Sequence, residues 1–113
     1  MFLLRSIILF NLFVLLNTNC TLAQDYEIDL DAGQEVFINN CAACHANGEN
    51  TADPAKTLKF DILESNSMNS ISAITYQVNN GKNGMPAFGN RLSDEEIQNV
   101  ANYVLNQSSK NLW

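Results

Sequence analysis

Cys41, Cys44 and His45 are the residues of this sequence whose types and spacing are most specific for chemistry. They form a Cys-x-x-Cys-His run, in which two thiols three residues apart lie on the same side of one helical turn. Each sulfur can then bond one vinyl group at the edge of a haem, and the histidine that follows is carried beneath the iron as the proximal ligand. The run is therefore typical of covalent attachment of a c-type haem.

Two other kinds of site also use closely spaced cysteines, namely a thioredoxin-like dithiol and a zinc site. A zinc site needs further ligands, but His45 is the only histidine and the sequence has no second cysteine pair. A thioredoxin-like domain needs strands that alternate with helices, and the hydrophobic pattern does not show them. The haem interpretation is favoured over both alternatives.

A further candidate ligand lies in the glycine-rich stretch from Gly81 to Asn90, which contains Met85 followed by Pro86. The proline favours an extended backbone at the methionine and prevents a helix there, so the thioether can be presented from a fixed loop. Met68 is the competitor, but it stands beside an expected helix start and is interpreted as an adaptable core residue. We therefore predict Met85 as the distal iron ligand.

Ligation by a histidine and a methionine leaves no open position on the iron, and the thioether favours the ferrous state. The predicted activity is transfer of one electron, so we expect no enzymatic reaction and no catalytic acid or base. The carboxylates of Asp94, Glu95 and Glu96 are interpreted as helix-start charges that favour the helix dipole. A haem-based ligand sensor or a peroxidase-like enzyme is an alternative, and either would need Met85 to leave the iron.

The first 23 residues have the pattern of a secretory signal peptide. Arg5 supplies a positive charge, residues 7–16 form an apolar run, and residues 21–23 resemble a small-residue cleavage site. The apolar run is shorter than the roughly 20 residues that a membrane-spanning helix needs. We predict cleavage after Ala23, which also removes Cys20; an uncleaved N-terminal anchor is the alternative.

Residues 24–113 are then expected to form a single small domain, for which a bound haem supplies part of the missing core. The full chain has 12 acidic and 6 basic residues and a net charge of -6; loss of Arg5 leaves 5 basic residues and a charge of -7. An acidic surface of this kind steers encounters with other proteins and rejects surfaces of like charge. We expect no nucleic-acid partner, no stable membrane insertion and a monomer.

The elements that must position these ligands are predicted to be helices, which makes the domain all-α. Asp29 is a candidate N-cap for a helix that runs into the haem motif, and Gly33 within it would let another helix approach closely. A short helical piece is expected around residues 57–64, and Leu58, Ile62 and Leu63 are candidates for lining the haem pocket. Two further helices are expected, one from a cap at Ser70 to Gly81 and one after the capping box at Ser93–Glu96. Their apolar faces contain Ile71, Ile74 and Val78 in the first, and Ile97, Val100, Ala101, Val104 and Leu105 in the second.

Several segments together resemble the cytochrome c6 family, over essentially all of residues 29–113. They are Asp29–Gly33, Asn40–Ala46, Met68-Asn69, Ala73–Val78, Asn80–Asn83, Met85–Gly89, Arg91-Leu92, Ala101–Leu105 and Trp113. The Cys-x-x-Cys-His run alone indicates only a c-type haem. Its combination with the segments around Gln77 and Met85 is much more specific.

The resemblance implies a class I cytochrome c fold, with about four helices wrapped around one covalently bound haem c and its iron. By family analogy, Cys41 and Cys44 attach the haem, His45 and Met85 ligate the iron, and Gln77 tunes the potential. It also implies a soluble carrier in the thylakoid lumen of an algal plastid or a cyanobacterium. Electrons would pass from cytochrome f of the cytochrome b6f complex to photosystem I.

Lys82 and Arg91 are expected from the resemblance to help docking to photosystem I. Three departures from the family pattern bear on docking strength and on the potential: Phe60 stands where a lysine is common, Asn90 where glycine is frequent, and Gly84 where alanine is usual. A bacterial periplasmic c-type cytochrome that donates electrons to a terminal oxidase or reductase is the alternative function, because fold and cofactor do not determine the partner.

Overall fold

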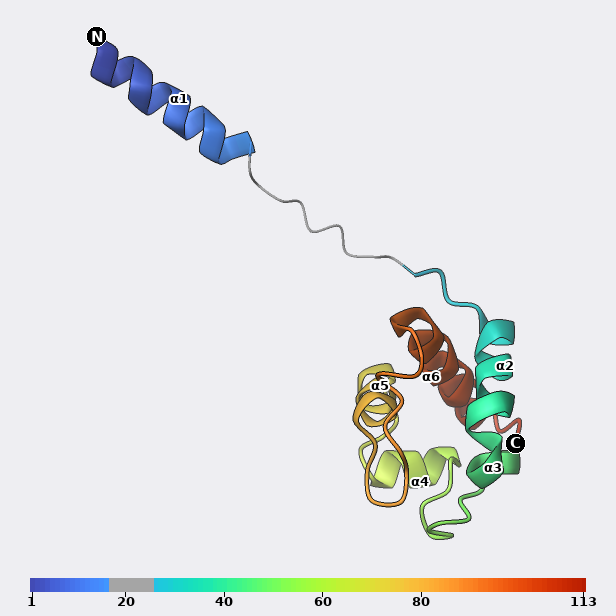
Figure 1. Cartoon of the computed structure of the whole chain (residues 1–113). Helices are drawn as coiled ribbons and strands as arrows, with labels where there is room; N and C mark the ends of the chain where they lie inside the picture. Colours follow the sequence, from blue (N-terminus) through green and yellow to red (C-terminus); the bar gives the residue numbers. More distant parts are fainter. Residues whose placement is uncertain (17–25) are drawn as a thin grey trace.

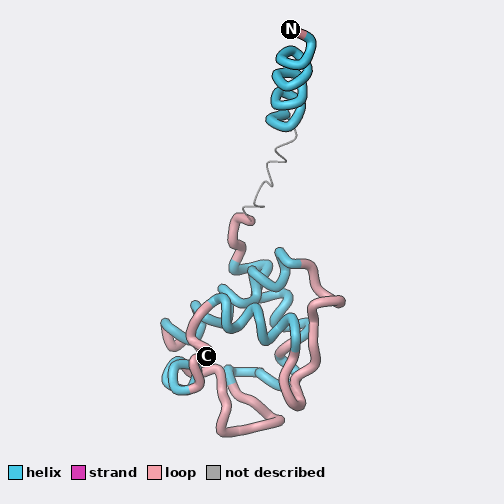
Figure 2. The backbone as a smooth tube through the Cα atoms, turned by 90° about the vertical axis from the view of Figure 1, so that its left-hand side faces the viewer, coloured by secondary structure: helices cyan, strands magenta, loops and turns pink. Residues whose placement is uncertain are grey.

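The computed structural model describes residues 1–16 and 26–113, and its regular structure in these residues is helical (Figures 1 and 2). A single antiparallel bridge pairs Lys82 with Met85, and the described part of the chain contains no β-strand. The all-α class predicted from the sequence is confirmed. The elements are α1 (Phe2–Leu16), α2 (Leu30–Asn40), α3 (Ala42–His45), a 3-10 turn η1 (Ala46–Gly48), α4 (Phe60–Ser65), α5 (Ile71–Asn80) and α6 (Asp94–Ser109).

Helix α1 coincides with the apolar part of the predicted signal peptide, and several of its apolar side chains are exposed, including Phe2 and Phe10. None of the helices in the described ranges is long and apolar enough to cross a bilayer. The expected cleavage after Ala23, with loss of Cys20, falls on residues outside those ranges. The signal peptide therefore stays a prediction.

Three predicted helix starts are confirmed by hydrogen bonds that the capping side chains make. The Asp29 carboxylate accepts the backbone N–H groups of Asp31 and Ala32, both at 3.0 Å. Ser70 Oγ accepts the N–H of the third helical residue of α5 at 3.2 Å. At α6, Ser93 and Glu96 satisfy each other's backbone N–H groups, which is the reciprocal capping box expected from the sequence.

Helix α6 packs against both α2 and α5, and this arrangement forms the centre of the domain (Figure 1). Gly33 lies where α2 meets α6, and a Cβ atom placed there would overlap the carbonyl oxygen of Asn99 and lie 2.9 Å from Cβ of Tyr103. The close helix approach predicted from this glycine is confirmed. The two backbones approach so closely because no side chain separates them.

A single cluster of buried apolar side chains fills the space between α2, α5 and α6, and it includes Phe88 from the loop before α6. Its members are Val36, Phe37, Ile74, Val78, Phe88, Ile97, Val100, Ala101 and Val104. Leu105, predicted for the same face, is only half-buried. The predicted piece around residues 57–64 appears as α4, in which Leu63 is buried and Ile62 half-buried; Leu58, just before α4, is also half-buried.

Replacement of Gly33 by alanine should lower the free energy of unfolding by about 1–3 kcal/mol, because the added methyl group forces α2 and α6 apart. The neighbouring Gln34 is exposed on the same helix and serves as the matched control. Gln34→Ala should change the stability by less than about 0.5 kcal/mol. Denaturant unfolding of both variants measures the difference, and equal stabilities would show that the helix crossing tolerates a side chain.

Candidate functional site

Cys41 joins two helices, since it ends α2 and begins α3. Its N–H donates to the carbonyl of Phe37 at 2.8 Å, and its own carbonyl accepts the N–H groups of Cys44 at 3.1 Å and His45 at 2.9 Å. The predicted helical turn between the two cysteines is therefore present. Both thiols are free, with Cys41 half-buried and Cys44 exposed. The end of a packed helix thus holds the whole run in one orientation.

Burial of Cys41 raises the pKa of its thiol from 9.0 to about 11, because the charged thiolate loses its hydration. The thiolate is the reactive form in disulfide exchange, and the first cysteine of a redox-active Cys-x-x-Cys pair has a lowered pKa. The shift in this chain goes in the opposite direction. The site therefore lacks the electrostatics of a thioredoxin-like dithiol.

The ring of His45 is oriented by a single backbone carbonyl, that of Glu49, which lies 2.9 Å from Nδ1. A carbonyl oxygen can only accept a hydrogen bond, so the proton of the neutral ring is on Nδ1. The lone pair is then on Nε2, which is the arrangement found in histidines that bind a metal. No cluster of three or more His, Cys, Asp or Glu side chains that could hold a metal occurs in the described residues, so the zinc alternative gains no support.

Met85 is presented by a tight turn in the loop that follows α5. Its N–H and carbonyl each pair with the opposite group of Lys82 at 3.0 Å. The turn packs onto Gly81, whose φ is +68° and where a Cβ atom would lie 2.6 Å from the carbonyl oxygen of Met85. Beyond Met85, the buried ring of Phe88 and the bond from its N–H to the carbonyl of Val78, at 2.8 Å, fasten the loop to α5. The predicted fixed loop is present.

Gln77, on α5, makes direct contact with the predicted distal ligand. Its Nε2 donates a hydrogen bond to Sδ of Met85 at 3.5 Å, and both side chains are half-buried. Met68, interpreted from the sequence as core filler, is only half-buried and is not part of the core cluster. It lines a cavity of about 220 Å³ beside the Gln77 side chain, together with Ala73, Tyr76, Gly81 and Lys82.

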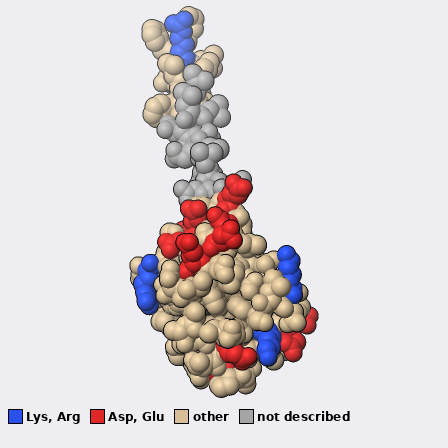
Figure 3. All heavy atoms as spheres, turned by 90° about the vertical axis from the view of Figure 1, so that its right-hand side faces the viewer, with Lys and Arg blue, Asp and Glu red and all other residues tan. Residues whose placement is uncertain are grey.

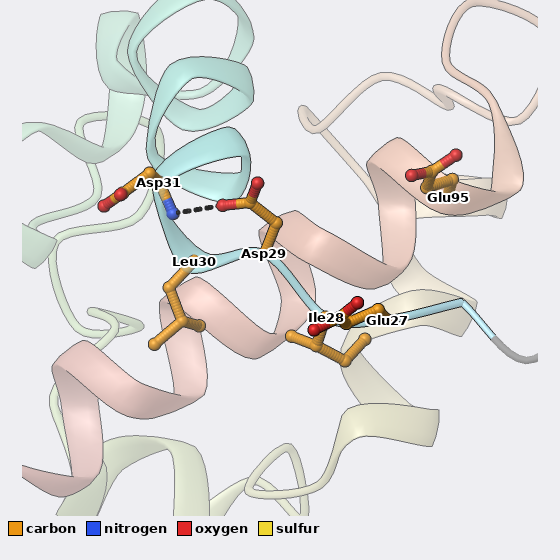
Figure 4. Close-up of a pocket in the computed structure, with 6 residues that line it drawn as sticks. All are labelled: Glu27, Ile28, Asp29, Leu30, Asp31 and Glu95. Atoms are coloured by element: carbon orange, nitrogen blue, oxygen red, sulfur yellow. Dashed lines mark hydrogen bonds between the residues drawn. The ribbon is translucent and has the colours of Figure 1, made fainter.

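Another hollow in the described structure lies away from these residues, at the start of α2 (Figure 4). It measures about 530 Å³ and is lined by Glu27, Ile28, Asp29, Leu30, Asp31 and Glu95. Acidic side chains gather on this end of the molecule (Figure 3). Asp29 is occupied in capping α2, and Asp31 and Glu95 lie in first helical turns, where acidic residues favour the helix dipole. These residues contribute neither a sulfur nor an imidazole and are separate from the candidate site.

Glu49 is the member of the site that the sequence analysis missed. It acts through its backbone carbonyl, and every residue has such a group, so its type carries no signal. Its position four residues after His45, directly after the Asn47-Gly48 pair that turns the chain, is the one hint in the sequence.

The sequence of the chain is similar to those of known proteins. Residues 28–104 match the family described as "Cytochrome C oxidase, cbb3-type, subunit III". A cytochrome c6 from Pyropia tenera is 68% identical over 82 residues, which cover 73% of this chain and 96% of that protein. A second, from Gracilaria tenuistipitata var. liui, is 65% identical over 88 residues, which cover 78% of this chain and 81% of that protein. The chain belongs to the cytochrome c6 family.

The solved structures support the same assignment. Cytochrome c6 from the diatom Phaeodactylum tricornutum superposes with a TM-score of 0.72 at 49% identity, covering 75% of this chain and 99% of that one. Cytochrome c6C from Synechococcus sp. PCC 7002 superposes with a TM-score of 0.69 at 44% identity, covering 71% and 98%. Membership of the cytochrome c6 family makes this chain an electron-transfer protein of photosynthesis, not an enzyme, with haem c and its iron as the cofactor.

Proposed function

We propose that this chain carries single electrons from cytochrome f of the cytochrome b6f complex to photosystem I, in the thylakoid lumen of an algal plastid or a cyanobacterium. The family membership supports a photosynthetic carrier. The observation that carries the proposal is that this chain holds two groups suited to bind iron, an imidazole oriented through Nδ1 at His45 and a thioether in a fixed turn at Met85. With both residues as ligands, an iron would have no position left for an external ligand, which suits electron transfer.

The donor groups of the site fit haem c. Cys41 and Cys44 would hold the haem through two thioethers, with Nε2 of His45 and Sδ of Met85 as the iron ligands. A bound haem c supplies an iron that exchanges one electron between its ferrous and ferric states. His45 and Met85 would be the two residues that hold the iron, and the apolar core against which Cys41 and Met85 pack excludes water from that side.

Gln77 has its proposed tuning role through the hydrogen bond to Sδ of Met85. A donor on the sulfur withdraws electron density from it, so the thioether donates less to the iron and the ferrous state is favoured. The bond therefore raises the midpoint potential.

Lys82 and Arg91 are proposed to contact photosystem I from the two ends of the loop that presents Met85. Both are exposed, and the ion pairs of the described residues involve Lys56 and Lys59 instead. The guanidinium carbon of Arg91 lies 4.7 Å from the ring centroid of Phe88, which holds this charge beside the Met85 loop. A short-lived electron-transfer complex needs only a small interface, often below about 1,200 Å² of buried area.

A second candidate function is donation of electrons to a terminal oxidase. It is favoured by the description of the matching family, which names an oxidase subunit. The identity of 53–68% with proteins named cytochrome c6 favours the photosynthetic partner.

Met85→Ala should open the iron to external ligands. The reduced variant should bind carbon monoxide readily at neutral pH and the ferric variant should lose its red-region sulfur-to-iron band, whereas the unchanged protein should bind carbon monoxide poorly. Absorption spectroscopy measures both effects. Met68→Ala is the matched control and should keep the band; a band that survives in Met85→Ala would remove Met85 from the ligand set.

The same preparations test the attachment. The chromophore should stay on the chain in acidified organic solvent, both in the unchanged protein and in Met85→Ala, because the two thioethers do not depend on the axial sulfur. Extraction of the chromophore would contradict the roles of Cys41 and Cys44.

Gln77→Leu should lower the midpoint potential by up to about 40 mV, which corresponds to loss of about 1 kcal/mol of hydrogen bonding in the reduced state. A redox titration measures the shift. Gln98 is the matched control, since it lies on α6 and Gln98→Leu alters no contact of the Met85 sulfur. An unchanged potential in Gln77→Leu would show that the bond to Sδ does not act on the iron.

Flash-induced oxidation of the reduced protein by photosystem I particles tests the proposed partner directly. Oxidation should be fast at low ionic strength, and Arg91→Gln should slow it and weaken its dependence on salt, because a docking charge is lost. Lys110→Gln, which removes an exposed charge at the end of α6, is the matched control. No oxidation by photosystem I particles, together with rapid oxidation by a terminal oxidase, would favour the second candidate function.

A further inference from the structure

Trp113 lies in a cluster of three aromatic rings beside the start of the haem motif. Its ring centroid is 5.3 Å from that of Phe37 and 6.2 Å from that of Tyr103, and the last two rings are 5.5 Å apart. Phe37 is the residue whose carbonyl holds the N–H of Cys41. The cluster therefore connects Trp113 to the end of α2, where the haem motif starts.

The indole of Trp113 also covers the backbone of the segment that follows His45. A Cβ atom at Gly48 would lie 2.5 Å from Cγ of Trp113, so the ring packs directly on this glycine. Gly48 has a φ of +70° and is buried. Glu49 directly follows Gly48 in the chain, and its carbonyl accepts the hydrogen bond from His45.

A hydrogen-bonded chain reinforces this contact. Nε1 of Trp113 donates to the carbonyl of Leu58 at 3.1 Å and lies 3.2 Å from Oγ of Ser108, which itself lies 2.5 Å from the same carbonyl. The N–H of Leu58 donates to the carbonyl of Gly48 at 2.7 Å. The two backbone groups of Leu58 thus join Trp113 to Gly48 by a second route.

We infer that Trp113 is a positioning residue for His45, which acts by holding Gly48 and thereby the Glu49 carbonyl that orients the imidazole. The inference rests on the proposed function, in which His45 ligates the iron. It assigns to a residue 68 positions away in the sequence a role in setting the electron donation of the proximal ligand.

The sign of the effect follows from the hydrogen bond on Nδ1. A carbonyl that accepts this proton makes the imidazole a stronger donor, which stabilises ferric iron and lowers the potential. Displacement of the Glu49 carbonyl should therefore raise the potential. A loss of stability alone should instead lower the potential, because a loosened protein admits water to the haem, and water favours the more highly charged ferric state.

The test uses the haem-loaded protein with Trp113→Ala and Trp113→Phe. Trp113→Ala removes both the ring and the N–H donor, so the Nδ1 proton of His45 should exchange with solvent at least about tenfold faster in the reduced protein. The midpoint potential should rise. Trp113→Phe keeps a ring over Gly48 but loses the donor to Leu58, and should give smaller changes of the same sign. Nuclear magnetic resonance measures the exchange and a redox titration the potential.

Ile97→Ala is the control for lost stability, since Ile97 is 1% exposed in the same core but lies near the start of α6. It should lower the unfolding midpoint, leave the exchange of the His45 proton unchanged, and leave the potential unchanged or lowered. The Trp113 variants could instead show only a lowered unfolding midpoint, with unchanged exchange of the His45 proton and an unchanged or lowered potential. That result would overturn the inference and leave Trp113 a structural residue. Where Trp113→Ala yields no haem-loaded protein, Trp113→Phe decides alone, and wild-type exchange in it overturns the inference.

Failure of the proposed function would look different. The ring protons of an iron-bound imidazole are shifted strongly upfield by the ring current of the haem in the reduced protein. Absence of such shifted His45 signals in the unchanged protein would contradict iron ligation itself. Their presence, with exchange unaffected by Trp113, contradicts only the positioning role.

Discussion

The direct contact between α2 and α6 at Gly33 is the constraint on which the rest of the domain depends. Without a side chain at this position, the backbone of α2 reaches the carbonyl of Asn99 on α6. The haem motif begins where α2 ends, so this crossing decides where Cys41 and His45 lie relative to the core. A small domain that buries little surface needs such close backbone packing, and it needs a cofactor to complete its interior.

The two sides of the candidate site are held by different physical means. On the His45 side, the predicted ligand follows a helical turn and is oriented by a backbone carbonyl from a segment only four residues away. On the Met85 side, the predicted ligand stands on a loop, and its turn is closed by backbone bonds to Lys82 and by contact with Gly81. Side-chain donation from Gln77 then acts on the sulfur itself. The first arrangement sets the direction of a ring, and the second sets the position and basicity of a thioether.

Charge is distributed unevenly over the domain, and this bears on how it meets partners. Carboxylates concentrate where α2 and α6 begin, because acidic residues favour the positive ends of helix dipoles (Figure 3). Lys82 and Arg91 lie at either end of the loop that presents Met85. The acidic residues at the helix starts therefore also contribute to the electric field around the domain. Such a field can orient an approaching partner protein before contact, even where the interface is small.

The sequence by itself determined the local features of this protein. The Cys-x-x-Cys-His run, the caps at Asp29, Ser70 and Ser93, and the constraint of Pro86 on the residue before it all act over a few residues, so their types and spacing were sufficient. Family resemblance added Gln77 as a tuning residue. The all-α class and these three helix starts were confirmed for the same reason, whereas the piece expected around residues 57–64 is helical only from Phe60 to Ser65.

Only the tertiary structure decided which of these groups meet. The hydrogen bond from Gln77 to Met85 depends on how a loop folds back on α5, and Met68 proved to line a cavity instead of the core. The contact of the Glu49 carbonyl with His45 and that of Trp113 with Gly48 were equally hidden. A backbone carbonyl looks alike at every residue, and contact between residues far apart in the chain follows from helix packing, which no local pattern records.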